Sequence, residues 1–469
     1  MSETSEAHAS EAHAPASGGI VAQAWPMLVA QLAFILNFTI DTAMAGRLSP
    51  VQLAGVALGL NLYVSIAIAM IGVLAALGPI AAHHFGAGRL DHVGRDVHQA
   101  IWLAAFLSLP GCAALAWHDP WIRMAGPGAD VAQVTSAYLT AAAFGLPGAL
   151  GTRVFVTLNS ALSRPKFTMA INLTAVLLKV PLNALFIWGA GPVPALGGAG
   201  CAVATACQSW LTFALGLAFW RWHPYFKPFH HSDGPRLQLP QWPLQKELLR
   251  IGVPAGLSTL FEVTSFTLMA VLVARLGAAT LSGHQIVGNI AAILFMVPLS
   301  TGFASSALVA QALGAGNARR ARALSVQGLR LAAVGGCTLA LLTWLAREPI
   351  IAAYTTDPQV AAQAHRLIAL AAAFHTFDAL QGVSVFVLRG YKVTVAPMLI
   401  YAISLWGIGL GGGYWLAYRG LFLVPALGSV GLWAAALVGL SVAAVCLVSL
   451  TLYVSRRRVE ADALTSVGP

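Results

Sequence analysis

Three acidic side chains lie inside apolar stretches of this sequence, where charged residues are rare. Asp41, Glu262 and Asp378 are each surrounded by apolar residues over several turns of a predicted helix. Loss of hydration disfavours the charged form of a carboxyl, so such a group can take up a proton near neutral pH or hold a monovalent cation. An acid at the centre of a membrane helix costs about 2.5–3.5 kcal/mol, which favours a functional role. The alternative is a structural ion pair.

The residues one turn away from two of these acids add rings and polar groups. Residues three or four apart share one helical face, so Asp378 lies beside Phe374 and Gln381. No Lys or Arg lies within a helical turn of Asp378 or Glu262 in the sequence. A carboxylate beside aromatic faces suits a flat, amphipathic cation, although ordinary helix packing is the alternative for the rings. Gln285 is a candidate polar wall of this site. Three small hydroxyls and one ring have the same spacing around Glu262: Ser258, Thr259, Ser265 and Phe266.

The composition indicates that these helices lie in a lipid bilayer. Of the 469 residues, 58% are hydrophobic and 9% are charged, and the mean hydropathy is +0.76. A water-soluble domain carries about 25% charged residues. The net charge of +10 does not indicate nucleic-acid binding, because the cations lie mainly in short loops between apolar runs. The five cysteines form no CxxC motif and the histidines do not cluster, so we expect no metal centre apart from Na⁺ held by carboxylates.

Twelve apolar runs are long enough to cross a bilayer, which takes roughly 20 residues each. We therefore predict an all-α integral membrane protein with twelve transmembrane helices in two six-helix lobes. The longest polar stretch separates the sixth run from the seventh. The runs fall near 21–46, 52–80, 97–117, 131–160, 167–189, 196–221, 248–275, 280–310, 323–346, 360–388, 395–418 and 426–454. The predicted units are a flexible N-terminal tail at 1–20, an N-lobe at 21–221, a linker at 222–247, a C-lobe at 248–455 and a C-terminal tail at 456–469.

An internal repeat supports the division into two lobes. A shift of 228 residues superposes Pro26 on Pro254, and it superposes Gly86-Ala87-Gly88 on Gly314-Ala315-Gly316. Six spans is an even number, so both halves enter the membrane in the same direction. Parallel repeats of this kind occur in transporters, with the binding site between the halves. The shift also aligns Asp41 with Met269 and Glu262 with Phe34, so the two acids occupy the same helix of each repeat.

The positive charges predict the orientation. Lys and Arg are more frequent in the loops on one side of the twelve runs, a side to which we assign Arg389 among others. The positive-inside rule puts that side, and both termini, in the cytoplasm. The first 19 residues have no basic segment before the first run, which favours a cytoplasmic tail over a cleaved signal peptide.

Several motifs resemble one known family of membrane transporters. The segment 37–48, Asn-Phe-Thr-Ile-Asp-Thr-Ala-Met-Ala-Gly-Arg-Leu, resembles the first-helix signature of the multidrug and toxic compound extrusion (MATE) family. Four further segments are similar to its NorM-type bacterial branch. They are Arg164-Pro165-Lys166, 181–189, 194–201 and 388–392, and the resemblance covers residues 20–455.

The resemblance implies a secondary antiporter of the bacterial inner membrane that works by alternating access. Such a protein exports amphipathic, mostly cationic drugs in exchange for H⁺ or Na⁺; it is not an enzyme and has no cofactor. We expect a monomer whose partners are these small molecules and the bilayer, with no nucleic acid. The family's cation-coupling residues correspond to Asp41, Glu262 and Asp378. The substrate-binding candidates are Glu262, Asp378, Gln285, Phe266, Phe374 and Gln381.

Two positions depart from the family pattern. Phe374 stands where some members have a Tyr, which slightly favours H⁺ over Na⁺ because a phenyl ring offers no oxygen ligand. Lys179 stands where this branch usually has an Asn, four residues before Asn183. Lys179 could snorkel to an interface, bind carbonyls in the cleft as a neutral amine, or pair with Asp41. We favour the ion pair, in an N-lobe polar site formed by Asp41, Lys179, Asn183 and Asn37.

Other functions fit the sequence less well. A flippase for lipid-linked sugars in the same superfamily should have a basic cavity for pyrophosphate and often further helices. Export of an endogenous metabolite remains an open alternative to drug export. A membrane-embedded enzyme would need a cluster of His, Asp or Ser residues at the interface, and the sequence offers no such cluster. A channel would need a filter-like loop, which is equally missing from the sequence.

Overall fold

The computed structural model describes residues 19–230, 238–420 and 425–465. Over these residues the chain is a bundle of long helices with a single isolated β-bridge, between Ala190 and Val193, and no strand. Twelve of the helical segments are long and apolar enough to cross a membrane. The predicted fold class, all-α with twelve spans, is therefore confirmed. Most of the predicted tail at 1–20 lies outside the described residues, as do the middle of the linker and the last four residues.

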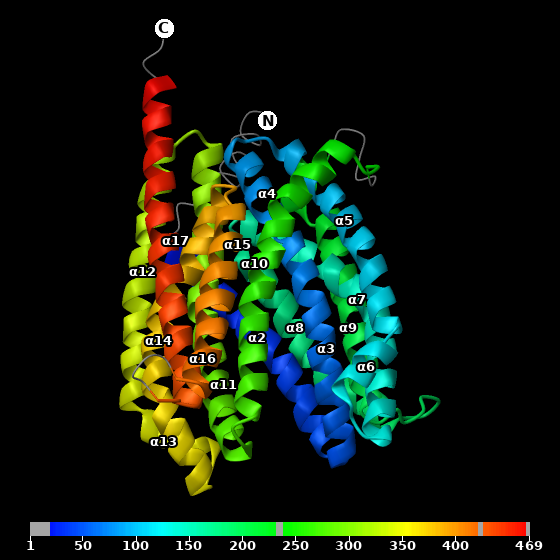
Figure 1. The fold of residues 1–469 in the computed structure, drawn as a ribbon. Coiled ribbons are helices and arrows are strands. Elements are labelled where there is room, and N and C mark those ends of the chain that lie inside the picture. The colour runs from blue at the N-terminus through cyan, green and yellow to red at the C-terminus, as the bar shows by residue number, and fades with distance from the viewer. Residues whose placement is uncertain (1–18, 231–237, 421–424, 466–469) are drawn as a thin grey trace.

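The first six spans, which make up the predicted N-lobe, lie at the centre and right of Figure 1. Prolines near the start of α3 and α8 suit the first turn of a helix, where a missing N–H costs nothing. Ser49 also caps α3 by accepting a hydrogen bond from the Gln52 backbone N–H, 3.2 Å. The helices are α2 (Ile20–Gly46), α3 (Pro50–Leu74), α4 (Leu77–Gly86), α5 (Leu90–Ala116), α6 (Asp119–Ala125), α7 (Ala129–Ala161), α8 (Pro165–Trp188) and α9 (Ala199–Trp222).

The last six spans, which make up the predicted C-lobe, lie at the centre and left of Figure 1. Its eleventh span is interrupted by a stretch of π-helix, η2 (Ala402–Gly412), which contains four of the span's five glycines. A 3-10 helix, η1 (Pro224–Phe229), lies in the predicted linker. The other helices are α10 (Trp242–Ala274), α11 (Ala278–Gly314), α12 (Ala318–Leu345), α13 (Arg347–Tyr354), α14 (Pro358–Gly390), α15 (Val395–Tyr401), α16 (Gly413–Tyr418) and α17 (Ser429–Thr465).

Several helices are longer than their apolar runs. The second and eighth spans continue to Gly86 and Gly314, beyond the predicted ends at 80 and 310. Helix α17 continues to Thr465, through ten residues that the sequence analysis assigned to a tail, and its last turns project beyond the neighbouring helices at the top of Figure 1. A helix can leave the hydrocarbon region without ending, so hydropathy marks the membrane and not the helix terminus.

Equivalent helices of the two repeats pack against each other where the lobes meet. Helix α2 packs on α11, and its repeat partner α10 packs on α3. At one end the approach is backbone to backbone: a Cβ on Gly86 would overlap the carbonyl of Gln311, and one on Gly314 would overlap the carbonyl of His83. His83 and Gln311 are themselves 228 residues apart, so the two contacts are related by the repeat. The interface therefore has an approximate twofold symmetry, as in an isologous dimer.

This close approach predicts that glycine is required at both positions. We expect Gly86→Ala and Gly314→Ala each to force the lobes apart at this end, because an added methyl in a tightly packed contact costs about 1–3 kcal/mol. Spin labels on α5 and α12 would report the change as a longer inter-lobe distance in an electron resonance measurement. Gly335→Ala is the matched control, since a Cβ there would meet no atom within 4 Å. An unchanged distance distribution in both interface variants would contradict the predicted role.

Candidate functional site

A glutamine side chain joins the two C-lobe acids. Gln381 on α14 donates one hydrogen bond from Nε2 to Oε1 of Glu262 on α10, 3.1 Å, and another to Oδ1 of Asp378, 3.0 Å. Both oxygens lie close to one nitrogen, so they are within about 6 Å of each other. Gln381 and Asp378 are buried, and Glu262 is half-buried. The structure thus brings together three of the residues that the sequence analysis selected.

A tyrosine that the sequence analysis did not select fixes the orientation of this amide. The Tyr401 hydroxyl, from α15, donates to Oε1 of Gln381. Because Oε1 accepts from Tyr401, the Nε2 group of Gln381 is left to donate to both carboxylates. Tyr401 is 1% exposed, so this network is enclosed by three helices. Tyr401 lies 20 residues after Gln381 in a different helix, and no sequence spacing links the two.

Aromatic rings lie one helical turn from each of the two acids, Phe266 from Glu262 and Phe374 from Asp378. The rings of Phe266 and Phe374 meet edge to face with centroids 5.6 Å apart, and Phe374 also meets Trp433, 5.8 Å away. Trp433 donates from Nε1 to His284. Phe374 is 2% exposed and packs in the C-lobe core. Gln285, the candidate polar wall, is exposed on α11 and lies outside this hydrogen-bonded group.

Among the basic side chains that the structure describes, only a histidine lies within ion-pair distance of Glu262 or Asp378. Among the described residues, no Lys or Arg nitrogen lies within 4.0 Å of a carboxylate oxygen of Glu262 or Asp378. His375 Nδ1 is 3.9 Å from Asp378 Oδ2, which is too long for a hydrogen bond. The Arg389 guanidinium donates to the Thr259 hydroxyl, 3.3 Å, one turn from Glu262. Two neighbouring carboxylates in a site of low dielectric constant repel each other unless one is protonated or a cation lies between them.

The N-lobe acid has a different environment, because it is already paired. Lys179 Nζ on α8 lies 2.8 Å from Asp41 Oδ1, and Lys179 also donates to the Thr205 hydroxyl of α9. Asn183, one turn along α8, donates from Nδ2 to the same oxygen of Asp41, 2.8 Å. Lys179 and Asp41 are each 1% exposed, so the lysine does not snorkel to an interface. The ion pair that the sequence analysis favoured is thus confirmed.

Asn37 belongs to a neighbouring polar group. Its Nδ2 donates to the Ala33 carbonyl, and its Oδ1 accepts from Nε2 of Gln208 on α9, 2.9 Å. Asn37 is one turn from Asp41 on α2, but its side-chain hydrogen bonds go to other groups. Thr205 and Gln208 were missed because a single polar residue on an apolar helix carries no spacing signal.

The buried pair leads to a prediction about stability. We expect Lys179→Ala to lower the free energy of unfolding by about 3–5 kcal/mol, because it leaves the Asp41 carboxylate buried without a cation. Combining Lys179→Ala with Asp41→Asn should restore part of that loss, since no buried charge then remains. Thermal unfolding of the purified variants in detergent measures both effects. If the loss in the double variant equals the sum of the two single losses, the residues do not interact and the prediction fails.

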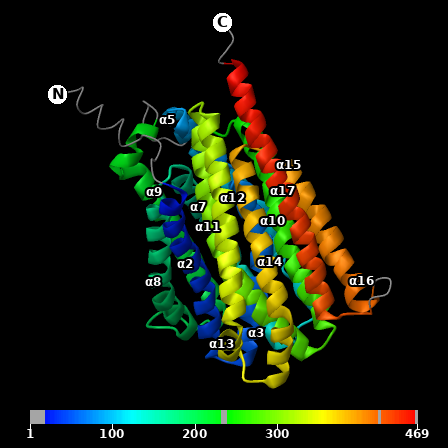
Figure 2. The same cartoon turned by 90° about the vertical axis from the view of Figure 1, so that its left-hand side faces the viewer.

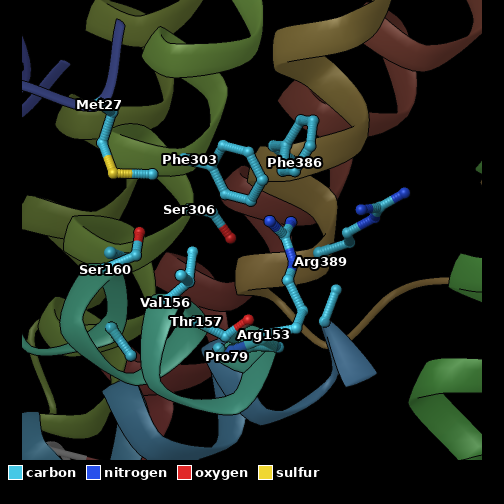
Figure 3. A pocket seen from close by; sticks show the side chains of 14 residues that line it. Met27, Pro79, Arg153, Val156, Thr157, Ser160, Phe303, Ser306, Phe386 and Arg389 are labelled. Atoms are coloured by element: carbon cyan, nitrogen blue, oxygen red, sulfur yellow. The ribbon is translucent and has the colours of Figure 1, made fainter. Parts of the chain in front are cut away.

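Two arginines that the sequence analysis misjudged meet in a small cavity between the lobes (Figure 3). Arg153, on α7, was not considered, although it lies inside the fourth apolar run. Arg389 was assigned to a loop, but it is inside α14 and is only 9% exposed. The Arg153 guanidinium carbon is 5.5 Å from the ring centre of Phe303 on α11, a cation–π contact that crosses the interface. The other labelled lining residues are Met27, Pro79, Val156, Thr157, Ser160, Ser306 and Phe386.

The all-helical fold with twelve candidate spans agrees with comparisons to known proteins. The sequence matches the MatE family over residues 26–185 and 254–415, which correspond to the two repeats. The chain belongs to the MATE family. Family membership and the twelve candidate spans make it a multi-pass membrane transporter of the bacterial NorM type, and not an enzyme.

Individual relatives support the same assignment of this MATE protein. It is 40% identical to a "Probable multidrug resistance protein NorM" of Aromatoleum aromaticum over 94% of this chain and 95% of that protein. It is 36% identical to a protein of the same name from Chromobacterium violaceum, again over 94% and 95%. Its fold resembles the crystal structure of the eukaryotic MATE transporter AtDTX14, with a TM-score of 0.82, 20% identity and coverage of 95% of this chain and 100% of that chain. At that identity, the structural likeness supports the fold alone.

Proposed function

We propose that this MATE protein is a secondary antiporter of the bacterial inner membrane, with both termini in the cytoplasm. It exports amphipathic, mostly cationic compounds in exchange for H⁺ or Na⁺. The proposal rests on one observation: Glu262 and Asp378 share the single amide donor of Gln381, while no Lys or Arg pairs with either acid within the described residues. The printed names of the relatives, multidrug resistance proteins, support drugs as the exported class.

The repulsion between these two acids drives the uptake of one cation. Two unit charges about 6 Å apart repel by ~3 kcal/mol at an effective dielectric constant of about 20. A proton, a Na⁺ ion or the positive group of a substrate each removes this repulsion, which corresponds to roughly two orders of magnitude in affinity. The pair therefore binds one cation at a time, and the substrate and the coupling ion compete for it. Competition at a shared site is what links export to the entry of the ion.

The N-lobe acid has no such role in this scheme. Lys179 already supplies the positive charge beside Asp41, and Asn183 donates to the same oxygen. A tethered ammonium cannot be exchanged for a mobile ion. We therefore assign coupling to Glu262 and Asp378, and we assign Asp41, Lys179, Asn183 and Asn37 to the structure of the N-lobe or to its lining.

Alternating access follows from movement of the N-lobe (21–221) against the C-lobe (248–455). The two lobes meet through repeat-related helices, and Glu262 lies on α10, one of the helices at that interface. Each ligand shifts the equilibrium between two states only by the difference in its affinity for them. The Phe266 ring, the exposed Gln285 and the half-buried Glu262 would contact the substrate. Phe374 and Gln381 would support them from behind.

Neutralising either C-lobe acid tests the proposal. We expect Glu262→Gln and Asp378→Asn each to abolish export driven by an imposed pH or Na⁺ gradient. Removing one of the two negative charges removes the repulsion for which the substrate and the coupling ion compete. The assay is efflux of a fluorescent cation such as ethidium from proteoliposomes, with each gradient imposed separately to identify the ion. Glu348→Gln is the matched control, because that carboxylate is 68% exposed at the start of α13. Gradient-driven export at wild-type rates in both acid variants would refute the assignment.

A further inference from the structure

One face of α12 carries an unusual row of arginines. Arg319, Arg322 and Arg330 are all exposed, and they line a shallow pocket on the protein surface. Residues separated by three, four, seven, eight or eleven positions lie on the same helical face. The arginines and the pocket's other residues follow that spacing. The other lining residues are Ala323, Val326 and Gln327.

This face points away from the rest of the protein. The opposite face of α12 is the buried one, and it includes Ala321, Ser325 and Leu329. Helix α12 packs on α11, α14 and α17, and it lies at the left edge of the molecule in Figure 1 and toward the viewer in Figure 2. The pocket therefore opens away from the protein, near the start of a candidate membrane span.

The three arginines lack acidic partners. Within the described ranges, no carboxylate oxygen lies within 4.0 Å of any of them, whereas the exposed Arg347 and Arg456 pair with Glu348 and Glu460. Arg330 lies seven residues, about 10 Å along the helix, inside the apolar run that begins near residue 323. An exposed guanidinium at that depth is costly unless a polar group meets it. Three unpaired charges at one pocket create a strong local attraction for an anion.

The same helical face continues as an apolar strip. Val334, Leu341 and Leu345 follow Arg330 by four, eleven and fifteen residues, and they are 67%, 56% and 59% exposed. Their spacing places them in line with Arg330 along the helix. The face thus presents positive charge at one end and exposed hydrocarbon along the rest. That order matches a phospholipid, whose phosphate is followed by acyl chains.

We propose that this face of α12 is a binding site for an anionic phospholipid. The phosphate binds among Arg319, Arg322 and Arg330, and an acyl chain lies along Val334, Leu341 and Leu345. Arginine suits this ligand because its planar fork can donate two hydrogen bonds to one phosphate. A soluble acidic peptide or free phosphate would leave the apolar strip unused, so the lipid is the occupant that both parts of the face favour.

The site predicts selective retention of anionic lipid by the whole protein. The protein is purified in detergent with equal amounts of phosphatidylglycerol and phosphatidylcholine of identical chains, and bound lipid is measured by native mass spectrometry. Wild type should retain phosphatidylglycerol preferentially. Each arginine near a membrane surface contributes about fivefold to the binding of an anionic lipid, so Arg330→Gln should lower retention by about that factor. Arg319→Gln, Arg322→Gln and Arg330→Gln together should remove the preference.

An exposed arginine outside the pocket provides the control for lipid retention. Arg366→Gln, which changes an exposed arginine of α14 outside the pocket, should retain as much phosphatidylglycerol as wild type. Equal retention of the two lipids by wild type would overturn the proposal, as would undiminished preference in a folded triple variant. If millimolar inorganic phosphate displaces the lipid from wild type, the site recognises phosphate alone and the proposed lipid specificity is wrong.

Discussion

Two carboxylates that share one amide donor are the constraint on which the functional arrangement depends. Gln381 can satisfy one oxygen of Glu262 and one of Asp378, but it supplies no charge. The remaining electrostatic requirement is a cation, and the described residues provide none in contact with these acids. The network also joins α10, α14 and α15, so a relative movement of these helices would alter the affinity for the cation. A binding site whose geometry depends on helix positions is the physical basis for coupling an ion to a change of state.

The negative charge of the acid in the first helix is balanced differently in the two repeats. Asp41 and Glu262 lie on the same helix of their repeats, yet Asp41 has a lysine at 2.8 Å and Glu262 has an amide. A built-in ammonium fixes the charge balance permanently, whereas an amide leaves it to be completed from solution. Under the proposed function, this asymmetry is the reason why a protein with an approximate twofold interface holds its exchangeable cation on one side only. The tight glycine contacts between α4 and α11 preserve the symmetry at the interface, where both lobes use equivalent residues.

The sequence predicted those parts of the structure that depend on the contrast between apolar and charged residues. The twelve spans are marked by their hydropathy, and the three acids stand out because each charge is isolated in an apolar run. The pairing of Lys179 with Asp41 followed because the sequence analysis found one acid and one lysine inside N-lobe spans. Contacts made across helices were harder to predict. Tyr401 and Thr205 reach their partners through packing that has no fixed sequence interval.

Arginine at a helix end proved the least predictable feature. Arg389 follows a long apolar run, and hydropathy cannot distinguish a loop from a helix that continues into the protein interior. Its burial depends on the neighbouring helices, since Ala255 and Thr259 of α10 supply the acceptors for its guanidinium. The repeat alignment likewise identified Gly86 and Gly314 as equivalent, but not that each faces the backbone of the other lobe.

The most direct test of the account is the number of exchangeable cations bound by each lobe. Purified protein can be titrated with H⁺ or Na⁺ while proton release or isotopic Na⁺ binding is measured. The account predicts one exchangeable cation per wild-type molecule, and the same number in the variant combining Asp41→Asn with Lys179→Ala. The variant combining Glu262→Gln with Asp378→Asn should bind none. Undiminished cation binding by that C-lobe variant, or its loss in the N-lobe variant, would contradict the assignment of coupling to Glu262 and Asp378.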